Sequence, residues 1–119
     1  MKIYLAGPMR GYKDFNFPAF FEAAAKLEAE GHEVFNPAGR DTKEWGADKL
    51  KTETGSEAEV AARLGFDGLT LARQCFLADT HYICTRADAI YVLPGWENSR
   101  GAKAERALGE AIGLQIVEL

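Results

Sequence analysis

Cysteine is scarce in this sequence, which has only Cys75 and Cys84 among its 119 residues. The two do not form a CxxC pair and no second pair exists, which excludes a CxxC metal site and a small secreted disulfide framework. We interpret both as small buried hydrophobic residues. The sequence also has no apolar run of membrane-spanning length, and no apolar segment follows Met1 as in a signal peptide. We therefore expect a cytoplasmic protein with no membrane partner.

Basic clusters are absent as well. The 14 Lys and Arg residues are scattered among 18 Asp and Glu residues, and the net charge is −4. Nothing resembles the basic stripe of a duplex-binding protein, so nucleic acid polymers are not expected as partners. The two histidines, His32 and His81, have no ligand-like spacing, and we expect neither a metal nor a cofactor.

What the sequence does contain is an alternation of strand and helix signals. Its 47% hydrophobic and 27% charged residues are typical of one compact domain over residues 1–119. Strands separated by helices imply parallel pairing with right-handed crossovers, so we expect a three-layer α/β fold with a parallel sheet of four or five strands. The expected strands lie within 2–6, 32–37, 88–95 and 114–119, and the expected helices within 17–31, 69–88 and 99–113.

Residues 36–69 lose this periodicity and are rich in Gly, Asp, Lys, Glu and Thr. A connection of this length is uncommon in a compact domain, where it is either a functional lid or a disordered segment. Ser56 and Glu59 form a capping-box pattern, which allows a short helix at 56–65. We therefore expect a long variable loop or lid at about 36–69.

A glycine-rich segment, GPMRG, follows the first expected strand. Ligands of open parallel sheets collect outside the carboxyl ends of the strands, where such loops lie. The flexible backbone surrounds Arg10, whose guanidinium can hold a phosphate or a carboxylate through two parallel hydrogen bonds. Glycine and proline after a strand are also ordinary turn residues, so a plain surface turn is the alternative.

A second segment, PGWENSRGAKAE, follows the third expected strand and opens a helix. Asn98 or Ser99 can cap this helix, leaving backbone N–H groups for an anion at its start. Gly101 lies one turn before Glu105 and clears space above its carboxylate for a ligand. The alternative from spacing alone is that Gly101 allows close packing and Glu105 pairs with a nearby lysine or arginine.

Three stretches, IYLAGPMRG, ADAIYVL and SRGAKAE, together resemble the nucleoside 2-deoxyribosyltransferase-like superfamily over nearly the whole chain. Within it the sequence is similar to a short bacterial and phage branch of unknown function and to nucleoside 5′-monophosphate N-glycosidases. The spacing of Ser99, Gly101 and Glu105 matches the superfamily's motif, in which the last residue is the nucleophile. The resemblance implies a Rossmann- or flavodoxin-like fold and a homodimer or larger homo-oligomer.

The resemblance also implies roles for individual residues. Glu105 attacks the sugar C1′, Tyr4 orients that carboxylate, and Asp79 is the general acid for the departing base. From the residues alone, Tyr4 is alternatively a core tyrosine and Asp79 a solvated helix residue. Trp96 and Phe17 either stack on the base or serve simple packing. The implied substrate-binding residues are Gly7, Arg10, Gly11, Ser99, Gly101 and Trp96.

Two classes of function follow from these assignments. The first is an enzyme, an N-glycosidase or deoxyribosyltransferase that cleaves the base–sugar bond of a nucleoside or deoxynucleoside 5′-monophosphate. The second is a protein of the same fold that binds or senses a nucleotide without cleaving it. Glu105 favours the enzyme, because a carboxylate beside a phosphate weakens binding and a pure binder has no need of it.

Overall fold

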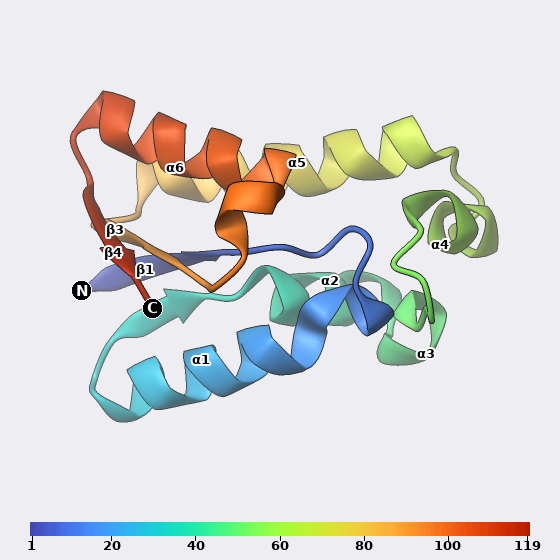
Figure 1. Cartoon of the computed structure of the whole chain (residues 1–119), viewed down its shortest axis with the longest axis horizontal. Helices are drawn as coiled ribbons and strands as arrows, with labels where there is room; N and C mark the ends of the chain where they lie inside the picture. Colours follow the sequence, from blue (N-terminus) through green and yellow to red (C-terminus); the bar gives the residue numbers. More distant parts are fainter.

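The computed structural model describes all 119 residues and contains one four-stranded sheet. The strands are β1 (Lys2–Ala6), β2 (Glu33–Phe35), β3 (Ala89–Val92) and β4 (Gln115–Glu118). They lie in the order β2-β1-β3-β4, and every neighbouring pair is parallel. Helices lie on both sides of the sheet (Figure 1), which gives three layers. The predicted three-layer, Rossmann- or flavodoxin-like fold is confirmed.

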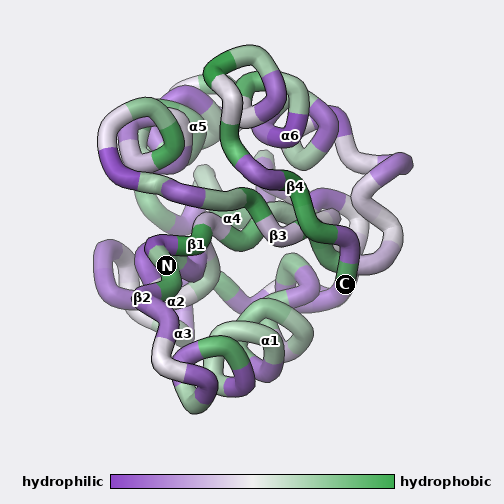
Figure 2. The backbone as a smooth tube through the Cα atoms, turned by 90° about the vertical axis from the view of Figure 1, so that its left-hand side faces the viewer, coloured by the Kyte–Doolittle hydropathy of each residue, from purple (hydrophilic) through white to green (hydrophobic).

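The two faces of the sheet are covered by different helices. α1 (Phe17–Ala29) lies against one face, and α5 (Gly68–Thr85) and α6 (Arg100–Ile112) lie against the other (Figure 1, Figure 2). Successive side chains of β1 point to opposite faces. Leu5 therefore packs with Phe20 of α1, while Tyr4 packs in the cluster that contains Ile83 of α5.

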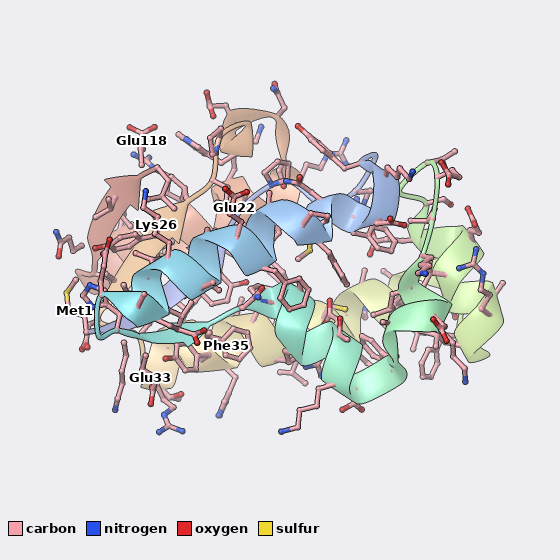
Figure 3. All side chains as sticks on the ribbon, turned by 90° about the horizontal axis from the view of Figure 1, so that it is seen from below. Met1, Glu22, Lys26, Glu33, Phe35 and Glu118 are labelled. Carbon is pink, nitrogen blue, oxygen red and sulfur yellow. The ribbon has the colours of Figure 1, made fainter.

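The helix α1 has one buried apolar face and one exposed polar face. In α1, Phe20, Ala24 and Leu27 are buried at helical spacing, whereas Glu22 and Lys26 point away from the sheet (Figure 3). None of the helices combines the length and the apolar character that a membrane span requires.

The segment 36–69 is folded, so the expectation of a long loop there was wrong. It forms α2 (Pro37–Trp45), α3 (Ala47–Leu50) and α4 (Glu57–Leu64). Asn36 caps α2 by accepting a hydrogen bond from the Ala38 N–H at 3.0 Å, and the fixed φ of Pro37 suits the first helical turn. These helices are short and mostly polar, so they contain too few periodic apolar positions to be recognised in the sequence.

The short helix allowed by the capping-box pattern is confirmed as α4. Ser56 Oγ accepts a hydrogen bond from the Glu59 N–H at 3.2 Å. Val60 of α4 and Leu50 of α3 pack with Phe15 in a third hydrophobic cluster, which lies beyond the end of the sheet. This cluster anchors the three added helices to the rest of the domain.

A left-handed turn joins the loop after β1 to α1, in the short 3-10 helix η1 (Lys13–Asn16). Asp14, Phe15 and Asn16 have φ values of 49°, 53° and 62°, a region that residues with a Cβ seldom adopt. Thr52 holds the turn from both sides: the Asp14 N–H donates to its carbonyl at 2.6 Å, and its own N–H donates to Asp14 Oδ1 at 3.0 Å. The turn carries Phe15 into the third cluster.

The chain leaves β1 and β3 in opposite directions along the sheet. β1 leads through α1 to β2 on one side, and β3 leads through α6 to β4 on the other. A crevice forms outside the strand ends where such connections diverge. Gly7 lets the loop after β1 approach β3, since a Cβ on Gly7 would lie 2.8 Å from Leu93 Cβ. The loop from Gly7 and the helix start at Ser99 line the same cavity there.

Candidate functional site

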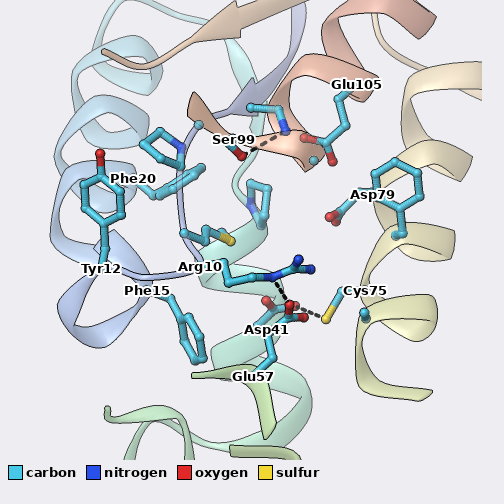
Figure 4. A pocket seen from close by; sticks show the side chains of 18 of the residues that line it. Arg10, Tyr12, Phe15, Phe20, Asp41, Glu57, Cys75, Asp79, Ser99 and Glu105 are labelled. Carbon is cyan, nitrogen blue, oxygen red and sulfur yellow. Dashed lines mark hydrogen bonds and ion pairs between the residues drawn. The ribbon is translucent and has the colours of Figure 1, made fainter. Parts of the chain in front are cut away.

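A cavity of about 810 Å³ lies at this crevice. Its wall is formed by β1 and the loop after it, by helices α1 to α5, and by the first turns of α6. Acidic and basic side chains from these elements project into it (Figure 4). Sites for small organic ligands commonly measure roughly 300 to 1,000 Å³. The cavity is therefore of a size to hold such a ligand.

Tyr4 and Glu105 form a buried hydrogen bond in the wall of the cavity. The Tyr4 hydroxyl donates to Glu105 Oε2 at 2.7 Å, and the two residues are 1% and 6% exposed. Burial, and then the negative charge of Glu105, raise the pKa of Tyr4 well above its usual range, so Tyr4 stays a hydroxyl donor. Glu105 Oε1 makes no hydrogen bond within the protein. This oxygen is thus left for a ligand.

Asp79 of α5 is a second buried carboxyl in the cavity wall. It is 8% exposed, and its Oδ1 is buried without any hydrogen-bond partner. Buried polar atoms of native proteins nearly always have a partner, and an ionised carboxyl with this oxygen unpaired is costly, which favours the protonated form of Asp79. Asp79 is therefore not a solvated helix residue, and the structure brings it together with Tyr4 and Glu105.

Both buried carboxyls, Glu105 and Asp79, have pKa values above their usual range. Burial, and then the charge of Asp79, raise the pKa of Glu105 well above its usual range, while the Tyr4 hydroxyl opposes the rise. Burial, and then the charge of Asp41, raise the pKa of Asp79 to about 7. Burial and mutual repulsion oppose ionisation of both carboxyls together, so at least one of them keeps a proton near neutral pH. The Tyr4 hydroxyl lowers the pKa of both carboxyls, and its hydrogen bond to Glu105 Oε2 stabilises the ionised form of Glu105.

The start of α6 lines the same cavity. Ser99 caps the helix, its Oγ accepting a hydrogen bond from the Ala102 N–H at 3.2 Å. The N–H groups of Arg100 and Gly101 precede the first helical hydrogen bond and have no partner within α6. A Cβ on Gly101 would meet no atom within 4 Å, because it would project into open space. Gly101 thus keeps the space beside Glu105 clear, as its position in the sequence predicts.

Arg10 also lines the cavity, but it already has an acidic partner. Its Nε pairs with Glu57 of α4, and the Arg10 side chain is 63% exposed (Figure 4). Gly7 is buried in the cavity wall at the start of the same loop. An anion in the cavity would therefore compete with Glu57 for the Arg10 guanidinium.

Two predicted binding residues lie outside the cavity. The Gly11 N–H donates to the Gly55 carbonyl at 3.0 Å, so this backbone donor is not free for a ligand. Trp96, in the short 3-10 helix η2 (Trp96–Asn98), lies under the Arg106 guanidinium and donates from Nε1 to Glu118 at 3.0 Å. The assignment of Trp96 to base stacking was wrong. Arg106 of α6 covers its ring, and Glu118 of β4 accepts its N–H.

Asp41 of α2 is a cavity residue that sequence reasoning missed. It is 8% exposed and pairs with Arg40 at 3.1 Å. It stands in a polar stretch with no motif and no adjacent strand end, so nothing in the sequence singles it out. Phe17, the other aromatic residue considered for stacking, does line the cavity.

The two cysteines differ in their exposure. Cys75 is half-buried at the cavity, whereas Cys84 is exposed, so its interpretation as a buried residue was wrong. Both lie on α5, whose outer side faces solvent at Cys84. No group of three or more His, Cys, Asp or Glu side chains is arranged to hold a metal ion.

Comparison with known proteins gives one match. Residues 1–118 match the family described as Domain of unknown function (DUF4406). No curated protein and no solved structure matches the chain. Since the match covers all but the last residue, the chain belongs to the DUF4406 family.

Proposed function

We propose that the protein cleaves the base–sugar bond of a nucleoside or deoxynucleoside 5′-monophosphate, as an N-glycosidase or a deoxyribosyltransferase, with Glu105 as the nucleophile. The observation that carries the proposal is the buried pair of Glu105 and Asp79 in one cavity, with the Tyr4 hydroxyl bound to one oxygen of Glu105. In the reactive form Glu105 is ionised and Asp79 is protonated, so that the two carboxyls supply an attacking group and an acid.

The chemistry proceeds in two displacements. Glu105 Oε1 bonds to C1′ while the bond from C1′ to the base nitrogen breaks, and the electron pair leaves with the base, which takes the proton of Asp79. Tyr4 holds the other oxygen of Glu105 in place. Water, or the nitrogen of a second base, then attacks C1′ and releases Glu105, and Asp79 takes up the proton. Water gives a sugar phosphate, and a second base gives a new nucleotide.

The start of α6 supports a position for the 5′-phosphate. The free N–H groups of Arg100 and Gly101, the Ser99 hydroxyl and the positive end of the helix dipole favour an anion at this point. Arg10 lies in the same cavity and contributes a second charge when it leaves Glu57. The catalytic carboxyl of Glu105 then lies about one helical turn after Gly101, the last residue of the phosphate subsite.

The experiment that tests the function is a substrate panel. The purified protein is incubated with nucleosides and with their 5′-monophosphates, and the released base is measured by chromatography. We expect free base from at least one monophosphate. Binding of monophosphates with no base from any of them would replace the enzyme with a non-catalytic nucleotide-binding protein.

We expect monophosphates to be preferred over nucleosides, and Arg10→Ala to remove much of that preference. A lost charge-assisted contact weakens substrate binding by about 1.5 to 3 kcal/mol. The effect should appear in KM for the monophosphate, with the nucleoside reaction little changed. Lys13→Ala, which removes an exposed charge in the adjoining turn, is the matched control. Equal use of nucleosides and monophosphates by the unaltered protein would contradict this assignment.

The superfamily resemblance implies a homodimer or larger homo-oligomer, and we further propose that two copies associate through α5. Leu69, Phe76 and Leu77 of α5 are 61%, 40% and 71% exposed, and Phe76 also lines the cavity. A second copy would cover these apolar side chains and close that side of the cavity. Light scattering should report a dimer or larger assembly for the unaltered protein and a monomer for Leu77→Glu. A monomeric unaltered protein would contradict the proposal.

A further inference from the structure

Asp41 stands at the far end of a row of carboxyls in the cavity. Figure 4 shows Glu105, Asp79 and Asp41 following one another along it. Their electrostatic effects follow the same order. The charge of Asp79 raises the pKa of Glu105, and the charge of Asp41 raises the pKa of Asp79. Asp41 comes from α2, which lies on a different side of the cavity from α5 and α6. A ligand that extends along the cavity from Glu105 would therefore pass Asp79 and then reach Asp41.

The surroundings of Asp41 hold one of its oxygens and leave the other free. Arg40 Nη1 lies 3.1 Å from Oδ1, and the Cys75 thiol donates to the same oxygen at 4.0 Å. The Arg40 guanidinium is itself held over the Trp45 ring, 5.1 Å from its centroid. Oδ2 makes no hydrogen bond and is not sealed from the cavity. Arg40 and Trp45 therefore fix the carboxylate through Oδ1 and leave Oδ2 free to accept a hydrogen bond from a ligand.

The charge state of Asp41 follows from the groups around it. Burial raises its pKa to about 6, and the nearby Glu44 adds slightly to the rise, while Arg40 opposes it. At pH 8 Asp41 is therefore ionised and can only accept hydrogen bonds. A buried carboxylate with one free oxygen costs stability unless a ligand donates to it.

The proposed reaction determines which part of the substrate meets this oxygen. With C1′ at Glu105 and the protonated base atom at Asp79, the base extends away from the phosphate at Ser99 and towards Asp41. The outer edge of a purine or pyrimidine carries its exocyclic amino or oxo group. An amino group donates to a carboxylate, whereas an oxo group is repelled by it.

We infer that Asp41 selects the base, its free carboxylate oxygen accepting a hydrogen bond from an exocyclic amino group on the outer edge of the base. The substrates are then adenine and cytosine monophosphates rather than their hypoxanthine and uracil counterparts. The inference rests on the proposed function, since the orientation of the base follows from the placement of C1′ at Glu105.

The test compares matched substrates at pH 8. We expect kcat/KM to be at least about tenfold higher for the adenine than for the hypoxanthine monophosphate, and for cytosine than for uracil. Asp41→Asn, whose amide both donates and accepts, should bring each ratio to within about threefold. Glu44→Gln removes an exposed charge on the same helix and should leave both ratios unchanged. Circular dichroism confirms that each variant is folded.

Equal rates for amino and oxo substrates in the unaltered protein, or an unchanged preference in Asp41→Asn, would overturn the inference. If the unaltered protein cleaves no substrate, the proposed catalytic function fails and the selectivity is measured by equilibrium titration of the same four monophosphates. Tighter binding of the amino pair that is lost in Asp41→Asn would still support the role of Asp41. Equal binding of all four would overturn it.

Discussion

Glu105→Gln is expected to abolish base release while the protein stays folded and still binds nucleotide. The amide has nearly the size of the carboxyl and can still accept the hydrogen bond from Tyr4, but it has no negative charge to attack C1′. We expect kcat to fall by about three orders of magnitude or more, because the lost interaction acts mainly in the transition state. Binding of the monophosphate should persist or tighten, since a charge that repels the phosphate is gone.

The matched control lies five residues further along α6. Glu110→Gln removes an exposed carboxylate that pairs with Arg106 at 2.6 Å. This change should alter stability by at most about 1 kcal/mol and leave base release intact. Base release, thermal melting and a binding titration are measured for both variants. A Glu105→Gln protein that releases base at the original rate would remove Glu105 from the mechanism.

Asp79→Asn is expected to change how stability depends on pH. The pKa of Asp79 is about 7 in the folded protein, against an ordinary value of 3.8. Between these values the folded state holds a proton that the unfolded state has lost, so the unaltered protein loses stability as pH rises from about 4 to 7. The asparagine side chain of the variant does not titrate, so the variant does not lose this stability as pH rises. Its stability relative to the unaltered protein should rise over that window, by as much as about 4 kcal/mol.

The measurement is denaturant unfolding at a series of pH values from 4 to 8. The difference between the two curves is informative even if the amide lowers stability equally at every pH. Asp48→Asn, at an exposed position in α3, is the control and should follow the unaltered protein. A difference between Asp79→Asn and the unaltered protein that does not vary with pH would show that burial of Asp79 imposes no such penalty.

The sheet and its three long helices were predictable because their signals are periodic and local. β1, β3 and β4 are apolar runs bounded by glycine, proline or polar residues, and α1 repeats Phe20, Ala24 and Leu27 at helical spacing. The strand ends indicate where a ligand binds, whereas the pairing of Tyr4 with Glu105 across 101 positions came from the superfamily resemblance.

Other features depend on contacts that no local pattern records. α2 and α3 bury too few residues to show a period, and Asp41 becomes part of the site only because α2 folds back over the strand ends. Gly11 matches a phosphate loop in sequence, but Gly55 takes its N–H. Trp96 follows a strand end as a stacking residue would, yet Arg106 and Glu118 turn it away from the cavity.

The most direct test of the nucleophile is to trap the sugar on the protein. A 2′-fluoroarabinosyl 5′-monophosphate slows both displacements, because fluorine disfavours positive charge at C1′, and hydrolysis of the glycosyl ester becomes the slow step. The mass of the protein is then measured after an acid quench, followed by peptide mapping. We predict one equivalent of base released per chain and a mass gain of the sugar phosphate on the peptide that carries Glu105. Base release with an unmodified protein, or a gain on any other residue, would contradict the account.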